Sequence, residues 1–293
     1  MTLATFPAWP GRDADVAELV AVYGPDQDAI AQDAARMLPP GLYGQPYLAK
    51  VPSQREFAIY CSEWKAAGGV GMCAHSNSAD LAKRYPTYAG IIVDAGLVPV
   101  CVAGLDSDDP KGKAQRLGAI LERDDCRALG HDLEGKGEDE AAQHEWSHAM
   151  EYARELLRLH GLAVLRKVLF DQPWPVPTKH WSRFPYEPYA GICRAHAEQD
   201  YVEDWIGVHH RERFAKCLPM FNHAWSILDA RLSQQRLKRA RWHTIQGYGY
   251  GDGMLDGLRY YLAKSLAAPV FVWTEWRATD LVMREIRAVN GMA

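Results

Sequence analysis

Short apolar runs alternate along this chain with longer segments whose apolar residues recur at helical spacing. The runs are nearly continuous rather than alternating, which is typical of parallel strands that are covered on both faces. Strands are expected at 41–50, 69–76, 97–104, 127–135, 162–171, 189–197, 241–251 and 269–276. Each is followed by a helical pattern, so the sequence predicts eight strand-then-helix units.

Eight such units favour an α/β fold, a (β/α)8 TIM barrel spanning residues 41–293. The rival is a doubly wound open sheet, but its nucleotide-binding form requires a G-x-G-x-x-G or P-loop motif that this sequence lacks. Residues 1–40 are expected to form a short N-terminal helical extension, with helices near 14–23 and 28–37, that closes the bottom of the barrel.

The composition removes several classes of function. The chain has 293 residues, 48% of them hydrophobic, and a net charge of −4, with one basic run at 236–243, so we expect no nucleic-acid partner. No apolar window is long enough for a membrane span, and the N-terminal residues do not resemble a signal peptide. We therefore expect cytoplasmic synthesis, with release or incorporation into a virion left open. The six cysteines lack metal-site spacing and are expected to be reduced core residues.

Polar side chains follow most of the predicted strands. In a (β/α)8 barrel the active site lies at the carboxyl ends of the strands, so these residues are candidates for one site. They are His75, Asp106, His131, Asp132, Glu134, Asp171, His196, Glu198, Gln246, Tyr248 and Glu275. Asp106 lies in a turn-like sequence and is better explained as a helix cap. Asp171 could also cap its loop.

Asp132 and Glu134 form the strongest pair. Residues two apart on a strand share a face, so both carboxyl groups can enter one pocket. Two neighbouring carboxyl groups can divide the tasks of proton donor and ionised partner, as glycoside hydrolysis requires. Glu275 or Glu198 is expected across the site from them. The alternative is that one carboxylate caps the next helix or pairs with Lys136.

The sequence "ALGHDLEGKGE", followed by a helix and "LAVLRKVL", resembles the D-x-E strand and the next helix-strand unit of the barrel muramidases of bacteriophage lysins and fungi. It is also similar to the related glycoside-hydrolase-like barrel of actinobacterial proteins, over roughly residues 69–257. The resemblance implies that Glu134 is the proton donor and Asp132 the assisting carboxylate.

Aromatic residues near the strand ends suit a glycan partner, because sugar rings stack on aromatic planes. Trp174, Tyr248 and Trp273 are the candidates that would bind substrate together with His75, His131, Asp171, His196 and Gln246. Packing of the loops is the alternative role for about half of the aromatic residues.

No cofactor is expected. Histidines and carboxylates at the strand ends could bind a metal, and His144 and His148 have zincin-like spacing, but neither set forms a complete motif. The favoured function is a glycoside hydrolase acting on a bacterial cell-wall or related polysaccharide by carboxylate acid/base catalysis. The alternatives are a non-catalytic barrel that serves as a virion, surface or carbohydrate-binding component, and a metal-dependent hydrolase.

Overall fold

The protein is a closed barrel of eight parallel strands, each paired with its neighbours in chain order and β8 paired with β1. The computed structural model describes residues 11–104, 109–133, 141–173, 184–200, 214–250 and 255–292. The strands are β1 (Gly41–Pro46), β2 (Gly71–Asn77), β3 (Val98–Gly104), β4 (Ala128–Leu133), β5 (Val168–Pro173), β6 (Ala195–Gln199), β7 (Ala240–Gln246) and β8 (Pro269–Thr274). The predicted (β/α)8 fold is confirmed.

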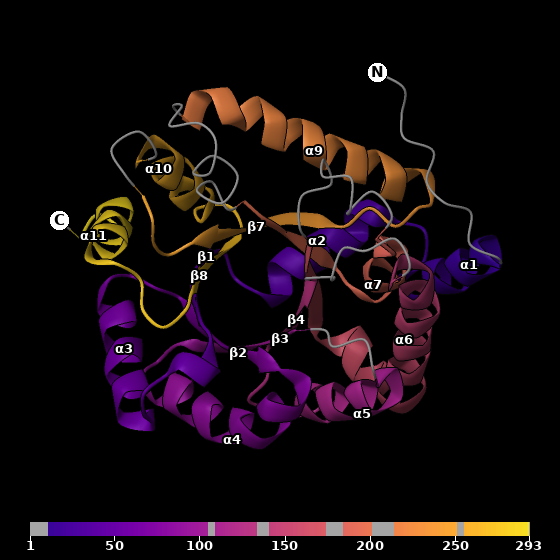
Figure 1. The fold of residues 1–293 in the computed structure, drawn as a ribbon, viewed down its shortest axis with the longest axis horizontal. Coiled ribbons are helices and arrows are strands. Elements are labelled where there is room, and N and C mark those ends of the chain that lie inside the picture. The colour runs from indigo at the N-terminus through magenta and orange to yellow at the C-terminus, as the bar shows by residue number, and fades with distance from the viewer. Residues whose placement is uncertain are drawn as a thin grey trace.

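Helices encircle the barrel, as Figure 1 shows in a view along it. They are α3 (Gln54–Ala66), α4 (Ser78–Asp94), α5 (Pro110–Leu121), α6 (Ala141–Arg166), α7 (Tyr186–Ile192), α9 (Phe214–Gln234), α10 (Leu255–Lys264) and α11 (Asp280–Val289), with a short 3-10 turn at Leu48–Lys50. Among these residues, no helix is both long and apolar enough to cross a membrane.

Two further helices precede the barrel and occupy different places. The first, α1 (Arg12–Tyr23), lies against α7, where the Tyr23 hydroxyl donates to the backbone oxygen of Ile192 at 2.9 Å. The second, α2 (Gln27–Met37), contributes Ala34 to the core inside the barrel, and Leu38 beyond its end does the same. The chain before β1 therefore covers one side of the barrel as well as plugging its interior.

The inside of the barrel is filled by large aromatic side chains. The rings of Phe170 on β5 and Phe271 on β8 stack with their centroids 4.6 Å apart, and Trp242 on β7 lies 5.6 Å from Phe170. Rings from non-adjacent strands can meet in this way only inside the barrel. Because side chains alternate along a strand, these residues fix which positions of each strand point inward.

Local sequence signals account for several helix boundaries. Ser53 caps α3 by accepting a hydrogen bond from the backbone of Glu56 at 3.2 Å, as its capping-box sequence predicts. Pro86 lies inside α4, and the helix is continuous around it although proline removes a backbone donor. Helix α6 continues past Gly161 to Arg166 through a kink at His160, which has non-helical backbone angles.

Two strands begin later than the sequence predicts. The run at 162–171 was expected to be extended, but its first part belongs to α6 and β5 begins at Val168. The run at 189–197 was expected to be extended, whereas its first part belongs to α7 and the strand begins at Ala195. Short apolar runs do not distinguish a buried strand from a buried helical turn. The expectation for the cysteines agrees with the structure where it can be examined, since Cys61, Cys73, Cys101, Cys126 and Cys193 are buried and free.

Candidate functional site

Asp132 lies at the carboxyl end of β4 and points into the mouth of the barrel. The residue is 7% exposed, and each of its carboxylate oxygens has a partner. Oδ1 accepts a hydrogen bond from Nε2 of Gln199 at 2.8 Å, and Oδ2 lies 3.1 Å from Nε2 of His75. Side chains from β2, β4 and β6 therefore meet at one carboxylate, at the end of the barrel where this fold places its active sites.

A layer of neutral amides lies beside this carboxylate and above the aromatic core. Gln172 on β5 exchanges hydrogen bonds with Gln45 on β1 across the barrel, at 2.6 and 2.9 Å. Its Nε2 also lies 3.0 Å from the Thr244 hydroxyl, and its backbone oxygen accepts from Gln199 at 2.7 Å. Gln199 therefore connects this amide layer to Asp132, because its Nε2 donates both to the backbone oxygen of Gln172 and to the Asp132 carboxylate.

Two buried polar atoms at the mouth have no hydrogen-bond partner among the described residues. They are Nδ1 of His75 and Oε1 of Gln199, on the two side chains that hold Asp132. Buried polar atoms are normally satisfied, so these atoms suit a bound ligand or water. The mouth therefore combines one carboxylate, one imidazole and one amide with unused hydrogen-bonding capacity.

Aromatic side chains flank these groups. The ring of Tyr47 contacts His75 with 5.4 Å between centroids, and Tyr248 contacts Trp273 at 5.7 Å. Tyr248 and Trp273 are both half-buried, and Gln246 is fully buried at the end of β7. These planes could stack on a sugar ring or on another flat apolar surface.

Four of the predicted site residues point away from the mouth. His131 hydrogen-bonds the hydroxyl of Tyr152 on α6 at 2.8 Å, with Nδ1 3.6 Å from the sulfur of Cys193. Burial, aided by the charge of Lys113, lowers the pKa of His131 to about 3. This histidine is therefore a neutral member of the layer between strands and helices.

The other three residues also lie in that outer layer. Asp171 and His196 pair with each other at 2.5 Å. Glu198 was expected to lie across the mouth from Asp132, but it pairs with Arg241 at 2.7 Å on the outward face of β6 and β7. Burial and the charge of Asp200 raise the pKa of Glu198 well above its usual value.

Of the remaining predicted residues, Glu275 is described by the structure. Glu275 follows β8 and is exposed. Glu134, Trp174 and Asp106 lie outside the described residues. The proposed metal-ligand set is also divided, since His75 contacts Asp132 whereas His131, His196 and Glu198 face the outer layer.

Sequence reasoning missed Gln45, Gln172 and Gln199, which organise the mouth. An available signal was the alternation of side chains: Gln172 is two residues beyond the buried Phe170, and Gln199 is two beyond Ala197. Counting outward from the apolar interior would have placed both amides inside the barrel.

Comparison with known proteins supports the fold. No protein-family model matches the chain, and no curated protein matches its sequence. Solved structures do match. The endo-β-1,4-mannanase of Thermotoga petrophila has a TM-score of 0.59 at 7% identity, with 86% of this chain and 76% of that chain covered.

Two other structures are similar at comparable identity. A GH26 β-mannanase of Bacteroides ovatus has a TM-score of 0.51 at 11% identity, covering 91% of this chain and 93% of that one. A putative deoxyribose-phosphate aldolase of Toxoplasma gondii has a TM-score of 0.51 at 12% identity, covering 90% and 98%. Mannanases and a putative aldolase, which have unrelated chemistries, share this architecture. The comparison therefore establishes the fold, and the chemistry must be argued from the residues at the mouth.

Proposed function

We propose that this chain is a glycoside hydrolase acting on a bacterial cell-wall or related polysaccharide through Asp132 and Glu134. The observation that carries the proposal is the position of Asp132, buried at the carboxyl-terminal mouth and held by His75 and Gln199. Glu134 follows two residues later in the sequence and is the proton donor that the muramidase resemblance implies.

In this reaction the proton donor protonates the glycosidic oxygen as the bond between that oxygen and the anomeric carbon breaks. The second carboxylate stays ionised and stabilises positive charge at the anomeric carbon, or activates the water whose hydroxyl group adds there. The N–H groups of His75 and Gln199 suit the ionised role for Asp132, because each can donate to a carboxylate oxygen. The flanking aromatic rings would then receive the apolar faces of the sugars.

Two further observations support the proposal. The barrel is similar in fold to solved structures of mannanases and endoglucanases, and Asp132, the first residue of the D-x-E sequence, lies at the carboxyl end of β4. Neither gives the linkage that is cleaved. Peptidoglycan, β-1,4-mannan and β-1,4-glucan are therefore the substrates to compare.

The test measures reducing ends released from each polysaccharide by the wild type and by Asp132→Asn and Glu134→Gln. A positioned general acid contributes about 10²–10⁴-fold, so Glu134→Gln should lose at least about a hundredfold in rate on the cleaved polysaccharide. Asp94→Asn, which changes an exposed carboxylate at the end of α4, is the matched control and should keep the wild-type rate. Equal rates for wild type and Glu134→Gln would reject the proposal.

A non-catalytic glycan-binding barrel is the second candidate. It is favoured by the engagement of both Asp132 oxygens and by the outward orientation of Glu198 and Asp171, which removes two of the predicted carboxylates from the mouth. Glycan binding by the wild type without release of reducing ends, weakened by Trp273→Ala, would support this candidate and exclude hydrolysis.

A further inference from the structure

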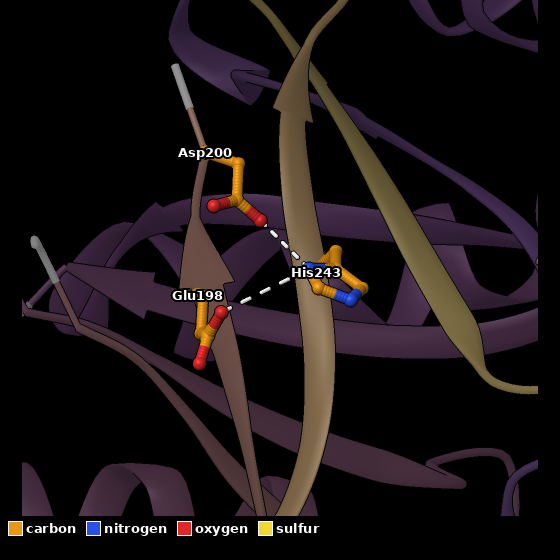
Figure 2. Close-up of side chains that lie close together, drawn as sticks. All are labelled: Glu198, Asp200 and His243. Atoms are coloured by element: carbon orange, nitrogen blue, oxygen red, sulfur yellow. Dashed lines mark hydrogen bonds and ion pairs between the residues drawn. The ribbon is translucent and has the colours of Figure 1, made fainter. Parts of the chain in front are cut away.

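A second group of polar side chains lies outside the barrel, between its strands and the helices α9 and α10. Glu198 is on β6, Asp200 directly follows that strand, and His243 is the registered neighbour of Glu198 on β7. Nδ1 of His243 lies 2.7 Å from Oδ2 of Asp200 and 3.9 Å from Oε2 of Glu198, as Figure 2 shows. One ligand-type atom from each residue lies within 4.8 Å of the others.

Neighbouring side chains hold both carboxylates, and Tyr261 of α10 also hydrogen-bonds Asp200. Oε1 of Glu198 pairs with Arg241 at 2.7 Å, and Oδ1 of Asp200 accepts from the indole N–H of Trp225 at 3.2 Å. Hydrogen bonds of this kind orient the ligands of metal sites. The ring of Tyr261 lies 5.4 Å from that of His243 and supports it from α10.

Oε2 of Glu198 lies 3.9 Å from Nδ1 of His243, which is too far for a hydrogen bond. Glu198 is 1% exposed, and this oxygen has no hydrogen-bond partner among the described residues. Burial of an unpaired carboxylate oxygen is costly. The hydrogen bond between His243 and Asp200 does not offset this cost, because it does not involve Oε2 of Glu198.

The charges around the group are also unbalanced. Glu198, Asp200 and the nearby Asp229 of α9 are opposed among the described residues by the guanidinium of Arg241. When all three carboxylates are ionised, they exceed the single guanidinium by two negative charges. A divalent cation would neutralise that excess.

We propose that Glu198, Asp200 and His243 bind a divalent transition-metal cation of the zinc or manganese class. An imidazole nitrogen with two carboxylate oxygens favours these ions over calcium and magnesium, which prefer oxygen ligands. Binding through Nδ1 requires the neutral imidazole of His243 to carry its single proton on Nε2, so the ring changes tautomer and loses no net proton. The side chain of Arg241 is 40% exposed, so the edge of the group is close to solvent.

The site is separate from the mouth but adjoins it through one residue. Gln199 lies between Glu198 and Asp200 in the sequence and donates to Asp132 on the other face of β6. A cation bound by residues of β6 and β7 would therefore fix the carboxyl end of β6, and with it the position of Gln199. We infer a structural role for the ion, which stabilises the folded state through the free energy of binding.

The test titrates chelator-treated, full-length protein with zinc or manganese chloride by calorimetry and counts bound ions by elemental analysis. The expected result is one ion per chain and an increase in the melting temperature, with weaker binding of magnesium and calcium. Glu198→Gln and His243→Gln should each weaken binding at least about tenfold. His223→Gln removes an exposed histidine from α9 and should leave binding unchanged.

Two results would overturn the proposal. One is the absence of a stoichiometric ion on the wild type, and the other is wild-type affinity in both ligand variants. If the variants do not fold, electron spin-echo spectroscopy of manganese bound to the wild type replaces them. Coupling to an imidazole nitrogen is then expected, and its absence would reject His243 as a ligand.

Discussion

The imidazole of His75 on β2 lies 3.1 Å from the carboxylate of Asp132 on β4, across the carboxyl-terminal mouth of the barrel. The strand between them ends in Gly104, which has no side chain to separate the two. His75 also contacts the ring of Tyr47, so an aromatic side chain from beyond β1 supports the imidazole. The pair is therefore fixed by elements that are distant in sequence.

His75→Phe should reduce the rate of glycan cleavage about tenfold to a hundredfold, because the ring remains but the N–H that orients Asp132 is lost. The loss should appear in kcat more than in KM. His75→Gln keeps a donor group and should recover part of the rate. Equal kcat values for wild type and His75→Phe, measured from released reducing ends, would contradict a positioning role.

Gln199 should have a comparable effect through a different atom. Gln199→Met is similar in size but removes the N–H that donates both to Asp132 and to the backbone oxygen of Gln172. We expect a decrease in kcat of about tenfold or more together with a small decrease in melting temperature. Kinetics at saturating substrate, with circular dichroism as the check on folding, would measure both effects.

The alternation of side chains explains what the sequence could predict about the mouth. The eight strands and their approximate ends followed from apolar runs, and Asp132 was identified at the correct end of its strand. The same reasoning selected ionisable residues at most strand ends, whereas the inward positions of β5 and β6 carry the neutral Gln172 and Gln199. Neutral amides can satisfy one another inside a barrel, while buried charges need partners.

Those partners come from distant parts of the chain, which is why the pairings of the outward residues could not be predicted. Glu198 pairs with Arg241, and His131 hydrogen-bonds Tyr152, and no local pattern joins either pair. Adjacent residues on a strand must face opposite ways, so placing Asp132 inside necessarily places His131 outside.

The buried ion pair between Glu187 of α7 and Arg231 of α9 should contribute strongly to the free energy of unfolding. Burial opposes ionisation of Glu187, but the charge and hydrogen bonds of Arg231 outweigh it and lower the pKa of Glu187. The two side chains meet through hydrogen bonds of 2.6 and 2.7 Å, and both are almost fully buried. Glu187→Gln should therefore destabilise the protein by about 3–5 kcal/mol, because a buried guanidinium loses its partner.

Denaturant unfolding would measure that change. Glu155→Gln is the matched control, since Glu155 forms a surface pair with Arg158 and should not alter stability measurably. Similar unfolding midpoints for Glu187→Gln and Glu155→Gln would contradict the importance of the buried pair.

Gly130 on β4 should not accept a side chain. A Cβ atom there would lie 2.5 Å from Cζ of Phe170, whose ring is stacked on Phe271 and cannot easily move. Gly130→Ala should cost about 1–3 kcal/mol in the free energy of unfolding. Gly90→Ala in α4, where no described atom lies within 4 Å of the added Cβ, should instead stabilise by about 0.5–1 kcal/mol. Opposite shifts in the denaturation midpoint are expected, and a neutral Gly130→Ala would show that the aromatic core adjusts.

His131 should make the stability of the protein depend on pH. Burial and the charge of Lys113 lower its pKa to about 3, whereas an unfolded histidine has a pKa near 6.5. Between pH 3 and pH 6.5, His131 is therefore protonated in the unfolded chain and neutral in the folded chain. The contribution of His131 is therefore fully present above pH 6.5 and decreases as the pH falls toward 3, by up to about 1.4 kcal/mol per pH unit.

His131→Phe should remove this contribution. At pH 7 the variant should be less stable by about 1–3 kcal/mol, because the buried hydroxyl of Tyr152 loses its partner 2.8 Å away. On acidification, however, its free energy of unfolding should fall less steeply than that of the wild type, since no buried imidazole resists protonation. Urea unfolding from pH 7.5 to pH 4 would measure both slopes, with His223→Gln as the exposed-histidine control. Parallel slopes for wild type and His131→Phe would mean that His131 is protonated in the folded protein, and that its hydrogen bond to Tyr152 survives with the imidazole charged.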